Sequence, residues 1–296
     1  MNRPTRRGPQ ISGKIRLDVA LVERGFVDSR ARAQASILAG EVYVDTVRAD
    51  KPGLRVPADA HIEIRTRRPA FVSRGGEKLD HALAAFAIDV SGLVAVDAGA
   101  STGGFTDCLL QHGARQVYAI DVGTGQLDWR LRQDLRVVSL EQRDIRGVTP
   151  EDLQEPVDLA TVDVAFISLS KVLPSVARLV RPGGSIVVLV KPQFEVGPKL
   201  ARRGVVRDAA VHREVLATII AAATRLRLSP IAATPSPIAG PDGNLEFFLH
   251  LRNTPDRAMP IDVDAVVTTA HATVKRSPAL GAAGRGQIHG PVPVSR

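Results

Sequence analysis

The sequence predicts an α/β protein, with a mostly parallel seven-stranded sheet that ends in an antiparallel edge strand, preceded by a small α+β domain. From residue 71 onward, short apolar runs alternate with helical patterns, and a glycine loop follows the first run. Strands that alternate with helices favour parallel pairing, with helices on both faces. Charge indicates the separate first domain, because residues 1–74 hold 15 Lys+Arg against 8 Asp+Glu, whereas residues 75–254 hold 19 against 20.

The composition is that of an ordinary globular protein, with 44% hydrophobic and 24% charged residues in a chain of 296. No apolar run approaches the roughly 20 residues that span a bilayer, and no apolar segment follows the basic N-terminus as in a secretory signal. The single cysteine, Cys108, excludes an internal disulfide and is expected in the core. We therefore expect a cytoplasmic monomer with no membrane association and, since the histidines show no ligand spacing, no metal.

The basic first quarter of the chain predicts a polyanionic partner. A nucleic-acid backbone is the first choice, and an anionic membrane surface is a weaker one. A solvated basic face without a partner is the alternative, and the confinement of the charge to one segment argues against it.

The chain divides by pattern into five segments. Residues 1–13 predict a flexible basic arm, residues 14–66 the small domain, residues 67–72 a linker, residues 73–254 the large domain, and residues 255–296 an extension that is largely disordered after 277. The small domain should contain helices at 16–24 and 30–39, closed by Gly25 and Gly40, and strands at 41–45 and 61–65. Ser29 should cap the second helix, with Ile37 and Leu38 facing inward. One further helix is expected within residues 260–276.

The stretch DSRARAQASILAGEVYVD, with the basic loop through Arg48 and Lys51, resembles the RNA-binding domain named after ribosomal protein S-four. This resemblance implies RNA binding through the second helix and the loop that follows it. The alternative is that the helix arginines are simply exposed. The residues expected to contact RNA are Arg16, Ser29, Arg30, Arg32, Lys51 and Arg74.

The segment VDAGASTGGF, residues 96–105, ends a predicted strand and opens a helix, where open α/β sheets bind ligands. Its glycine spacing differs from the G-x-G-x-x-G dinucleotide fingerprint. Asp121 and Asp144 follow the next two strands, placed for ribose hydroxyls and an adenine amino group. So many carboxylates would repel a phosphate, which favours S-adenosylmethionine as cofactor. Its expected contacts are Asp97, Gly99, Ser101, Thr102, Gly103, Gly104, Asp121 and Asp144.

Four of these residues have a simpler interpretation. Gly103 and Gly104 would serve helix–strand packing, Asp144 would cap a turn, and Asp121 would be a plain carboxylate at a strand end, although the ribose contact is preferred for Asp121. Trp129 also has two interpretations. It could stack on an adenine or an RNA base, but core packing is preferred.

Two charged residues end apolar strands at the same predicted sheet edge. Asp163 follows LATV and Lys191 follows VVLV, and neighbouring strands would bring them together as a half-buried ion pair. Lys78 lies in the helix before the first strand, and Glu246 heads the last strand. We expect Lys191 to be partly buried, paired with Asp163 and open to a cleft on its other side.

In order and context, Lys78, Asp163, Lys191 and Glu246 match the Lys-Asp-Lys-Glu tetrad of FtsJ-like RNA 2′-O-methyltransferases. With VSRGGEKL, DAGASTGGF, FISL, LVKPQFE and GNLEFFL, residues 14–252 resemble the TlyA family. The resemblance implies a Rossmann-like, S-adenosylmethionine-dependent enzyme that methylates cytidine 2′-hydroxyls of 16S and, in some members, also 23S ribosomal RNA. Some members carry a haemolysin label. The chain departs from the family pattern at two places. Val164 and Ala165 stand where the family usually has Leu and Ser, and the linker reads PAFV where a basic residue and a tryptophan are often found.

This resemblance suggests that Lys191 either removes the proton of a ribose hydroxyl or orients that hydroxyl. Asp163 would hold Lys191 in place and stabilise the positive sulfonium. Glu246 and Lys78 would position the ribose. The loop 195–208, with its basic residues Lys199, Arg202, Arg203 and Arg207, would cover the substrate, or be an ordinary surface loop. The competing functions are a membrane-active haemolysin and a non-catalytic ribosome-assembly factor.

Overall fold

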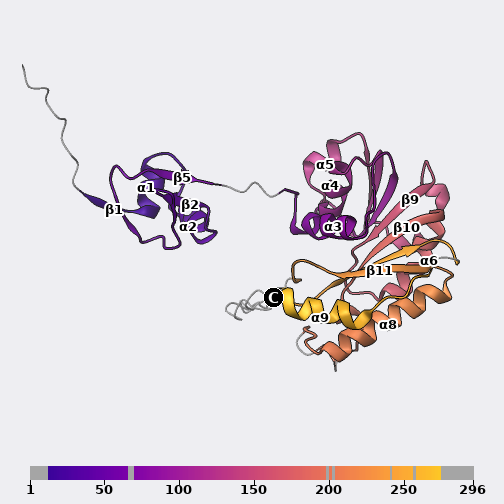
Figure 1. The fold of residues 1–296 in the computed structure, drawn as a ribbon. Coiled ribbons are helices and arrows are strands. Elements are labelled where there is room, and N and C mark those ends of the chain that lie inside the picture. The colour runs from indigo at the N-terminus through magenta and orange to yellow at the C-terminus, as the bar shows by residue number, and fades with distance from the viewer. Residues whose placement is uncertain are drawn as a thin grey trace, which may run out of the picture. The chain divides into compact units, whose positions relative to one another are not determined.

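The computed structural model describes residues 13–65, 70–197, 200–201, 204–240, 242–255 and 258–274. It divides the chain into two compact units, Met1–Ala70 and Phe71–Arg296 (Figure 1). Predictions for the arm before Gly13, for the linker at 66–69, for Lys199, Arg202 and Arg203, and for the tail after 277 concern residues outside these ranges.

The first unit packs two short helices against small antiparallel sheets. One sheet has the order β3-β2-β5, and the other pairs β1 with β4. Strands of two or three residues carry no readable alternation, which is why the sequence indicated only two of the five. The elements are β1 (Lys14–Arg16), α1 (Leu17–Glu23), α2 (Arg30–Leu38), β2 (Val42–Val44), β3 (Val47–Arg48), β4 (Arg55–Pro57) and β5 (Ile62–Ile64).

Helix α2 begins as the sequence predicts, because the Ser29 hydroxyl accepts a hydrogen bond from the Arg32 amide. Ile37 is fully buried in the core of this unit. The prediction that Leu38 also faces inward is wrong, since its side chain is 68% exposed. The two residues are about 100° apart around the helix, and the narrow core accommodates only one of them.

The second unit contains the predicted seven-stranded, mostly parallel sheet, with the order β11-β12-β10-β9-β6-β7-β8. The predicted antiparallel edge strand is displaced: β12 is antiparallel to both neighbours and lies inside the sheet, whereas β11 forms the edge. Both strands are short apolar runs joined by a hairpin-like turn, so the sequence alone does not say which one pairs with β10. The strands are β6 (Val94–Ala98), β7 (Gln116–Asp121), β8 (Val137–Glu141), β9 (Val157–Val162), β10 (Val180–Val190), β11 (Ser229–Pro235) and β12 (Phe247–Arg252).

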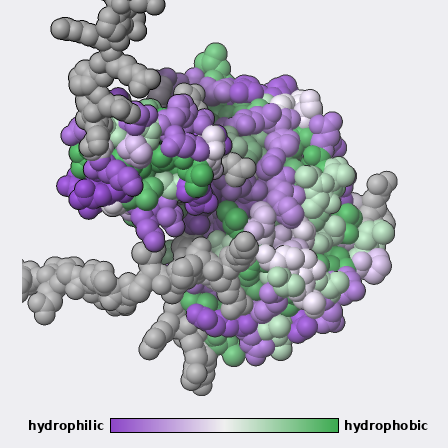
Figure 2. Space-filling model, turned by 60° about the vertical axis from the view of Figure 1, so that its left-hand side comes forward, coloured by the Kyte–Doolittle hydropathy of each residue, from purple (hydrophilic) through white to green (hydrophobic). Residues whose placement is uncertain are grey.

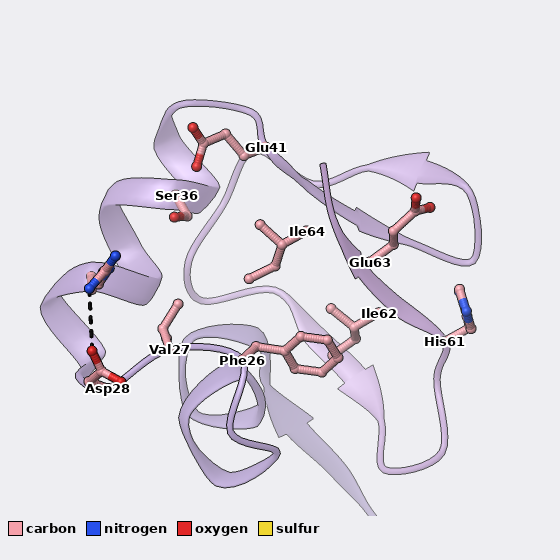
Figure 3. Close-up of a pocket in the computed structure, with 10 residues that line it drawn as sticks. Phe26, Val27, Asp28, Ser36, Glu41, His61, Ile62, Glu63 and Ile64 are labelled. Carbon is pink, nitrogen blue, oxygen red and sulfur yellow. Dashed lines mark hydrogen bonds and ion pairs between the residues drawn. The ribbon is translucent and has the colours of Figure 1, made fainter. Parts of the chain in front are cut away.

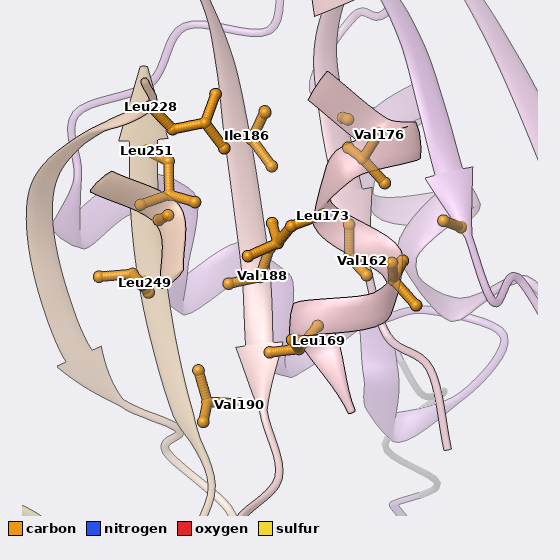
Figure 4. Packing of buried hydrophobic residues seen from close by; sticks show 14 of the residues in the cluster. Val162, Leu169, Leu173, Val176, Ile186, Val188, Val190, Leu228, Leu249 and Leu251 are labelled. Carbon is orange, nitrogen blue, oxygen red and sulfur yellow. The ribbon is translucent and has the colours of Figure 1, made fainter. Parts of the chain in front are cut away.

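Helices cover both faces of this sheet (Figure 1). On one face, α6 packs on β10, where Leu169, Leu173 and Val176 lie near Ile186, Val188 and Val190 (Figure 4), while α8 and α9 extend the same core over β11. On the other face, residues of α3 and α4 share a core with Val187 and Leu189. Successive side chains of a strand point to opposite faces, so an unbroken apolar run is what a doubly covered strand needs. The helices are α3 (Arg74–Ala85), α4 (Gly104–Gln111), α5 (Trp129–Gln133), α6 (Leu169–Leu179), α7 (Pro192–Glu195), α8 (Ala209–Arg225) and α9 (Val263–Thr273).

Two predictions about side-chain burial have opposite outcomes. Cys108 is fully buried, as predicted. The preferred core position of Trp129 is wrong, because its side chain is 66% exposed. Hydrophilic residues predominate on the face shown in Figure 2, with hydrophobic ones scattered among them. Across the described part of the chain, every helix is too short or too polar to cross a membrane.

Candidate active site

The carboxyl ends of β9 and β10 bring the first pair of charged residues together. The strands are parallel neighbours, and Asp163 and Lys191 directly follow their last residues. The Lys191 Nζ lies 2.5 Å from the Asp163 Oδ1, with the two side chains 15% and 23% exposed. The predicted pairing and partial burial of Lys191 are therefore confirmed.

A second ion pair joins elements far apart in the sequence. The Nζ of Lys78, on α3, lies 2.5 Å from the Oε2 of Glu246, which precedes β12. Their side chains are 11% and 1% exposed. Burial raises the pKa of Glu246 above its usual value, and the charges of Lys78 and Lys191 offset part of that shift. The lysine therefore makes an otherwise costly buried carboxylate tolerable.

All four residues line one small cavity of ≈ 280 Å³, here called the tetrad cavity. Arg74 and Thr102 form part of its wall. Arg74 is exposed on the first turn of α3, so its guanidinium is available to an anion that enters the cavity.

A larger cavity of ≈ 950 Å³ adjoins it, here called the cofactor cleft. Gly99, Ser101, Asp163 and Lys191 line both cavities. A group bound in the cleft and a group bound in the tetrad cavity would therefore meet beside the Asp163–Lys191 pair.

Asp121, at the end of β7, lines the cofactor cleft. Its carboxylate accepts hydrogen bonds from the amides of Ser101, at 2.8 Å, and Gly123, at 2.7 Å. These bonds fix its orientation, and carboxylate oxygens have lone pairs left for ribose hydroxyls.

Each of the three glycines after β6 would, with a Cβ added, meet a different neighbour. Gly99 has φ +87°, and a Cβ there would lie 2.4 Å from the carbonyl oxygen of Asp163. Gly103 lies against the side chains of Leu127 and Leu131, and Gly104 against Ser73. The geometry thus supports the packing interpretation for Gly103 and Gly104, whereas Gly99 lets the loop approach the end of β9.

Asp144 lies three residues beyond the end of β8 and caps a short 3₁₀ turn, Ile145–Gly147. Side-chain hydrogen bonds from Arg146 lower the pKa of Asp144. The carboxylate also lines the cofactor cleft, so the structure supports the turn cap without removing Asp144 from the site.

The cleft is not as acidic as the sequence suggested. Arg143, Arg146, Lys171 and Lys191 line it together with three aspartates. The argument that carboxylates would repel a phosphate is therefore wrong for this cleft. Charge alone does not select the cofactor.

Asp97 does not line either of these two cavities. Its carboxylate is fully buried and accepts hydrogen bonds from the hydroxyls of Thr106, at 2.7 Å, and Thr161, at 3.2 Å. It thereby ties β6 to α4 and β9. Burial raises the pKa of Asp97 to about 7.

The raised pKa of Asp97 predicts a pH-dependent stability. The folded protein keeps this proton up to about pH 7, whereas an unfolded aspartate releases it near pH ~4. The stabilisation is therefore fully present below pH ~4 and is lost as the pH rises through about 7, with a total of the order of 4 kcal/mol. We expect thermal unfolding between pH 5 and 8 to show a smaller fall of Tm in Asp97→Asn than in the wild type. Equal falls would contradict the assignment.

Several cleft residues were not singled out from the sequence. Phe166, 90% exposed and with φ +63°, lines the cleft, and its ring centroid lies 4.9 Å from that of Phe194. Val122 and Ile145 add apolar side chains suited to a flat base. Their positions in the sequence could have indicated them, since Phe166 and Phe194 lie three residues after Asp163 and Lys191, the charged residues that follow β9 and β10.

Glu195 is another residue that sequence reasoning missed. Its carboxylate accepts hydrogen bonds from the Ser168 hydroxyl, at 2.6 Å, and the Leu169 amide, at 2.9 Å. Burial raises its pKa. Glu195 thus joins the segment after Lys191 to the first turn of α6.

Two of the expected RNA contacts of the first unit, Arg16 and Arg30, form part of a hydrogen-bonded cluster. The buried carboxylate of Asp18 accepts from Arg16, Arg30 and Gln34 at 2.9–3.0 Å. The Arg16 guanidinium holds the pKa of Asp18 well below its usual range. Arg16 and Arg30 are about half exposed, and Lys51 is exposed, so all three remain accessible to a phosphate. Ser29 serves as the helix cap.

A groove of ≈ 760 Å³ lies between α2 and β5 of the same unit (Figure 3). Phe26, Ile62 and Ile64 contribute its apolar wall. Arg32 also lines it and is paired with Asp28 at 3.3 Å. Both side chains of this pair are largely exposed, so Arg32 remains accessible to a phosphate.

The described residues include one group with metal-ligand side chains that the sequence spacing did not indicate. Ligand atoms of Asp80, Cys108 and His112 lie within 4.8 Å of one another. Burial raises the pKa of the Cys108 thiol, however, and His112 Nε2 is already 2.7 Å from Asp80. A protonated thiol is a poor ligand, so the group fits a buried cysteine beside a hydrogen-bonded pair.

The fold and the two joined cavities, lined by paired lysines and carboxylates at the carboxyl ends of the strands, are those of an α/β enzyme with its ligand site at the sheet edge. Residues 71–253 match the FtsJ-like methyltransferase family, and residues 15–62 match the S4 domain. The chain belongs to the FtsJ-like methyltransferase family and, with its S4 domain, to the TlyA group. The resemblance seen in the sequence is thereby confirmed, and the chain is a methyltransferase.

Individual relatives extend over most of the chain. TlyA of Mycobacterium tuberculosis, named a 16S/23S rRNA (cytidine-2′-O)-methyltransferase, is 45% identical over 248 residues, 83% of this chain and 92% of that protein. Hemolysin A of Brachyspira hyodysenteriae is 38% identical over 238 residues, 80% of this chain and 99% of that protein. The solved structure of a hemolysin candidate from Streptococcus thermophilus is 41% identical, with a TM-score of 0.70, and the match covers 88% of this chain and 97% of that one.

Proposed function

We propose that this chain is an S-adenosylmethionine-dependent methyltransferase that modifies the 2′-hydroxyl of cytidine in 16S ribosomal RNA, with 23S ribosomal RNA as a second substrate. The observation that carries the proposal is the junction of the two cavities at Asp163 and Lys191. The name of the M. tuberculosis relative supports the cytidine ribose as the acceptor. The S4 domain supports an RNA partner.

The cleft fits the proposed cofactor in three respects. Asp121 offers oriented acceptors to a ribose, Val122 and Ile145 offer apolar walls to a base, and Gly99 leaves backbone exposed where the two cavities meet. S-adenosylmethionine supplies a methyl group on a sulfonium, which is a strong electrophile without further activation. We propose Ser101 and Thr102 as further contacts of this group, and Asp97 as a buried support of the loop.

The residues of the tetrad cavity then have to activate and align a weak nucleophile. Lys191 holds the 2′-hydroxyl and, in its uncharged form, accepts the proton that the oxygen loses. Asp163, 2.5 Å from Lys191, fixes the position of that amine. The Lys78–Glu246 pair orients the ribose, and Arg74 faces the adjoining phosphate. Alignment of the oxygen with the methyl group supplies much of the rate, because it removes the entropy cost of their encounter.

Arg16, Arg30, Arg32 and Lys51 would bind RNA outside the reacting nucleotide. Their phosphate contacts would make binding weaken with salt. A ribosomal substrate places the protein in the cytoplasm, where we expect it to act as a monomer.

A methyl-transfer assay tests the function directly. The full-length protein is incubated with S-adenosylmethionine labelled in its methyl group and with 30S or 50S subunits, and the RNA is then digested to nucleosides. We expect the label in 2′-O-methylcytidine from 16S RNA, and also from 23S RNA if both subunits are substrates. Label on a base would overturn the role of the tetrad.

Two further outcomes would favour the competing functions. Binding to subunits without transfer would support a non-catalytic assembly factor. Lysis of erythrocytes without transfer would support the activity that the names of the hemolysin relatives describe.

A further inference from the structure

The single tryptophan of the chain, Trp129, begins α5 and is 66% exposed. Leu127 and Leu131, two positions before and after it, are buried against the loop at Gly103. Leu131 is two residues from Trp129, about half a helical turn, so the side of α5 that Leu131 anchors is opposite the side that carries Trp129. Leu127 precedes the cap Asp128 and holds the entry to α5 from the same buried side. Single exposed apolar side chains are common on protein surfaces, so exposure alone implies no function.

The position of Trp129 is more informative than its exposure. The amide of Asp128 donates a hydrogen bond to the carbonyl oxygen of Thr102, at 3.1 Å, and Thr102 lines the tetrad cavity. Trp129 is therefore the next residue after Asp128, which is hydrogen-bonded to the wall of the tetrad cavity. The Asp128 carboxylate also caps α5 and accepts two hydrogen bonds from the Arg130 guanidinium, at 3.0 and 3.1 Å. The bond to Thr102 fixes the start of α5 beside the wall of the tetrad cavity, and this edge of the cavity is here called the rim.

Two ligands could use an aromatic surface near this rim. Trp129 lines neither the cofactor cleft nor the tetrad cavity, so its partner lies beside the reacting groups and is neither the cofactor nor the nucleotide being methylated. A nucleotide whose ribose reaches the partly buried Lys191 must leave its helix, and the adjoining nucleotides must then pass over the rim. Unpaired RNA bases are typically bound by stacking on aromatic side chains.

We propose that Trp129 is an RNA-positioning residue that stacks on the base of an unpaired nucleotide next to the one being methylated. Arg130 contributes less charge than its type suggests, because Asp128 neutralises it, so the indole face is the main contact. This inference rests on the proposed function, since it takes RNA as the ligand of the tetrad cavity.

The lone tryptophan provides a signal that requires no turnover. The intrinsic fluorescence of the full-length protein is recorded with a single-stranded oligocytidylate, with a duplex RNA of equal length, and with S-adenosylmethionine alone. We expect quenching by the single strand, much less by the duplex, and none by the cofactor. Quenching by the cofactor alone would overturn the proposal. So would an unchanged signal when the anisotropy of a labelled strand shows that it is bound.

Substitutions then connect this contact to the reaction. Trp129→Ala should raise the KM for RNA about tenfold, with kcat and cofactor binding unchanged, and Trp129→Phe should restore most of the loss. Met259→Ala is the matched control: it removes another exposed apolar side chain, beside the start of β11, and should change nothing. An unchanged KM in Trp129→Ala would overturn the proposal.

The two proposals fail separately. Quenching by RNA without methyl transfer would support the contact and contradict the methyltransferase function. Methyl transfer with an unaffected Trp129→Ala variant would contradict only the contact.

Discussion

Replacing Lys191 by Ala should lower the rate of methyl transfer by about 10²- to 10⁴-fold, the usual range for loss of a positioned general base. The variant removes the only amine that lines both cavities among the described residues. Cofactor binding should persist, because the carboxylate of Asp121, the proposed ribose contact, is held by the amides of Ser101 and Gly123 and not by the lysine. Single-turnover transfer and equilibrium binding of S-adenosylmethionine measure the two effects separately.

Lys171→Ala is the matched control for this experiment. Lys171 lines the cofactor cleft but not the tetrad cavity, so its loss removes a positive charge near the site without removing the proposed base. We expect transfer close to that of the wild type. A Lys191→Ala enzyme that keeps its rate would refute the role of the lysine, and equal losses in both variants would indicate a general effect of charge.

Replacing Gly99 by Ala should produce the second large effect, on stability and activity together. The new Cβ would lie 2.4 Å from the carbonyl oxygen of Asp163, on a backbone with φ +87°. Strain and a forced shift of packed backbone together should lower the free energy of unfolding by about 2–5 kcal/mol. Relief of the clash would move Asp163, so transfer should also be lost. Denaturant unfolding and the labelled-methyl assay measure the two losses.

The Gly92→Ala variant is the control that separates backbone strain at positive φ from a steric clash of the new Cβ. Gly92 has φ +71°, but a Cβ there would meet nothing within 4 Å. We therefore expect a cost of about 1 kcal/mol from the backbone alone and unchanged transfer. If Gly99→Ala were no more destabilising than Gly92→Ala, the close approach to Asp163 would not be what requires glycine.

The local features of the sequence were sufficient for the strands of the large sheet and for the charged residues at its edge, whereas three of the five very short strands of the first unit were not predicted. Unbroken apolar runs predict strands covered on both sides, and the charged residues that interrupt them mark the sheet edge. For that reason Asp163 and Lys191 could be predicted as a pair before any coordinates. The glycine spacing after β6 likewise distinguished this loop from a dinucleotide site.

Long-range pairing was beyond local patterns. The sequence does not show that β12 lies between β10 and β11 in the sheet. The two last strands, β11 and β12, are both short apolar runs joined by a hairpin-like turn, and either one could pair with β10. The roles of Asp97 and Trp129 also depend on neighbours distant in sequence. Asp97 is enclosed by Thr106 and Thr161, whereas Trp129 is left outside because Leu127 and Leu131 fill the space beneath α5.

The sequence by itself thus determined the two domains, the doubly covered sheet and the identities of the four charged residues, because these depend on period, spacing and residue type. Only the tertiary structure decided that Lys78 pairs with Glu246, 168 residues away, and that the two ion pairs line one cavity beside the cofactor cleft. The physical reason is that burial and pairing depend on which surfaces meet in space, and a strand's own sequence does not specify its partner.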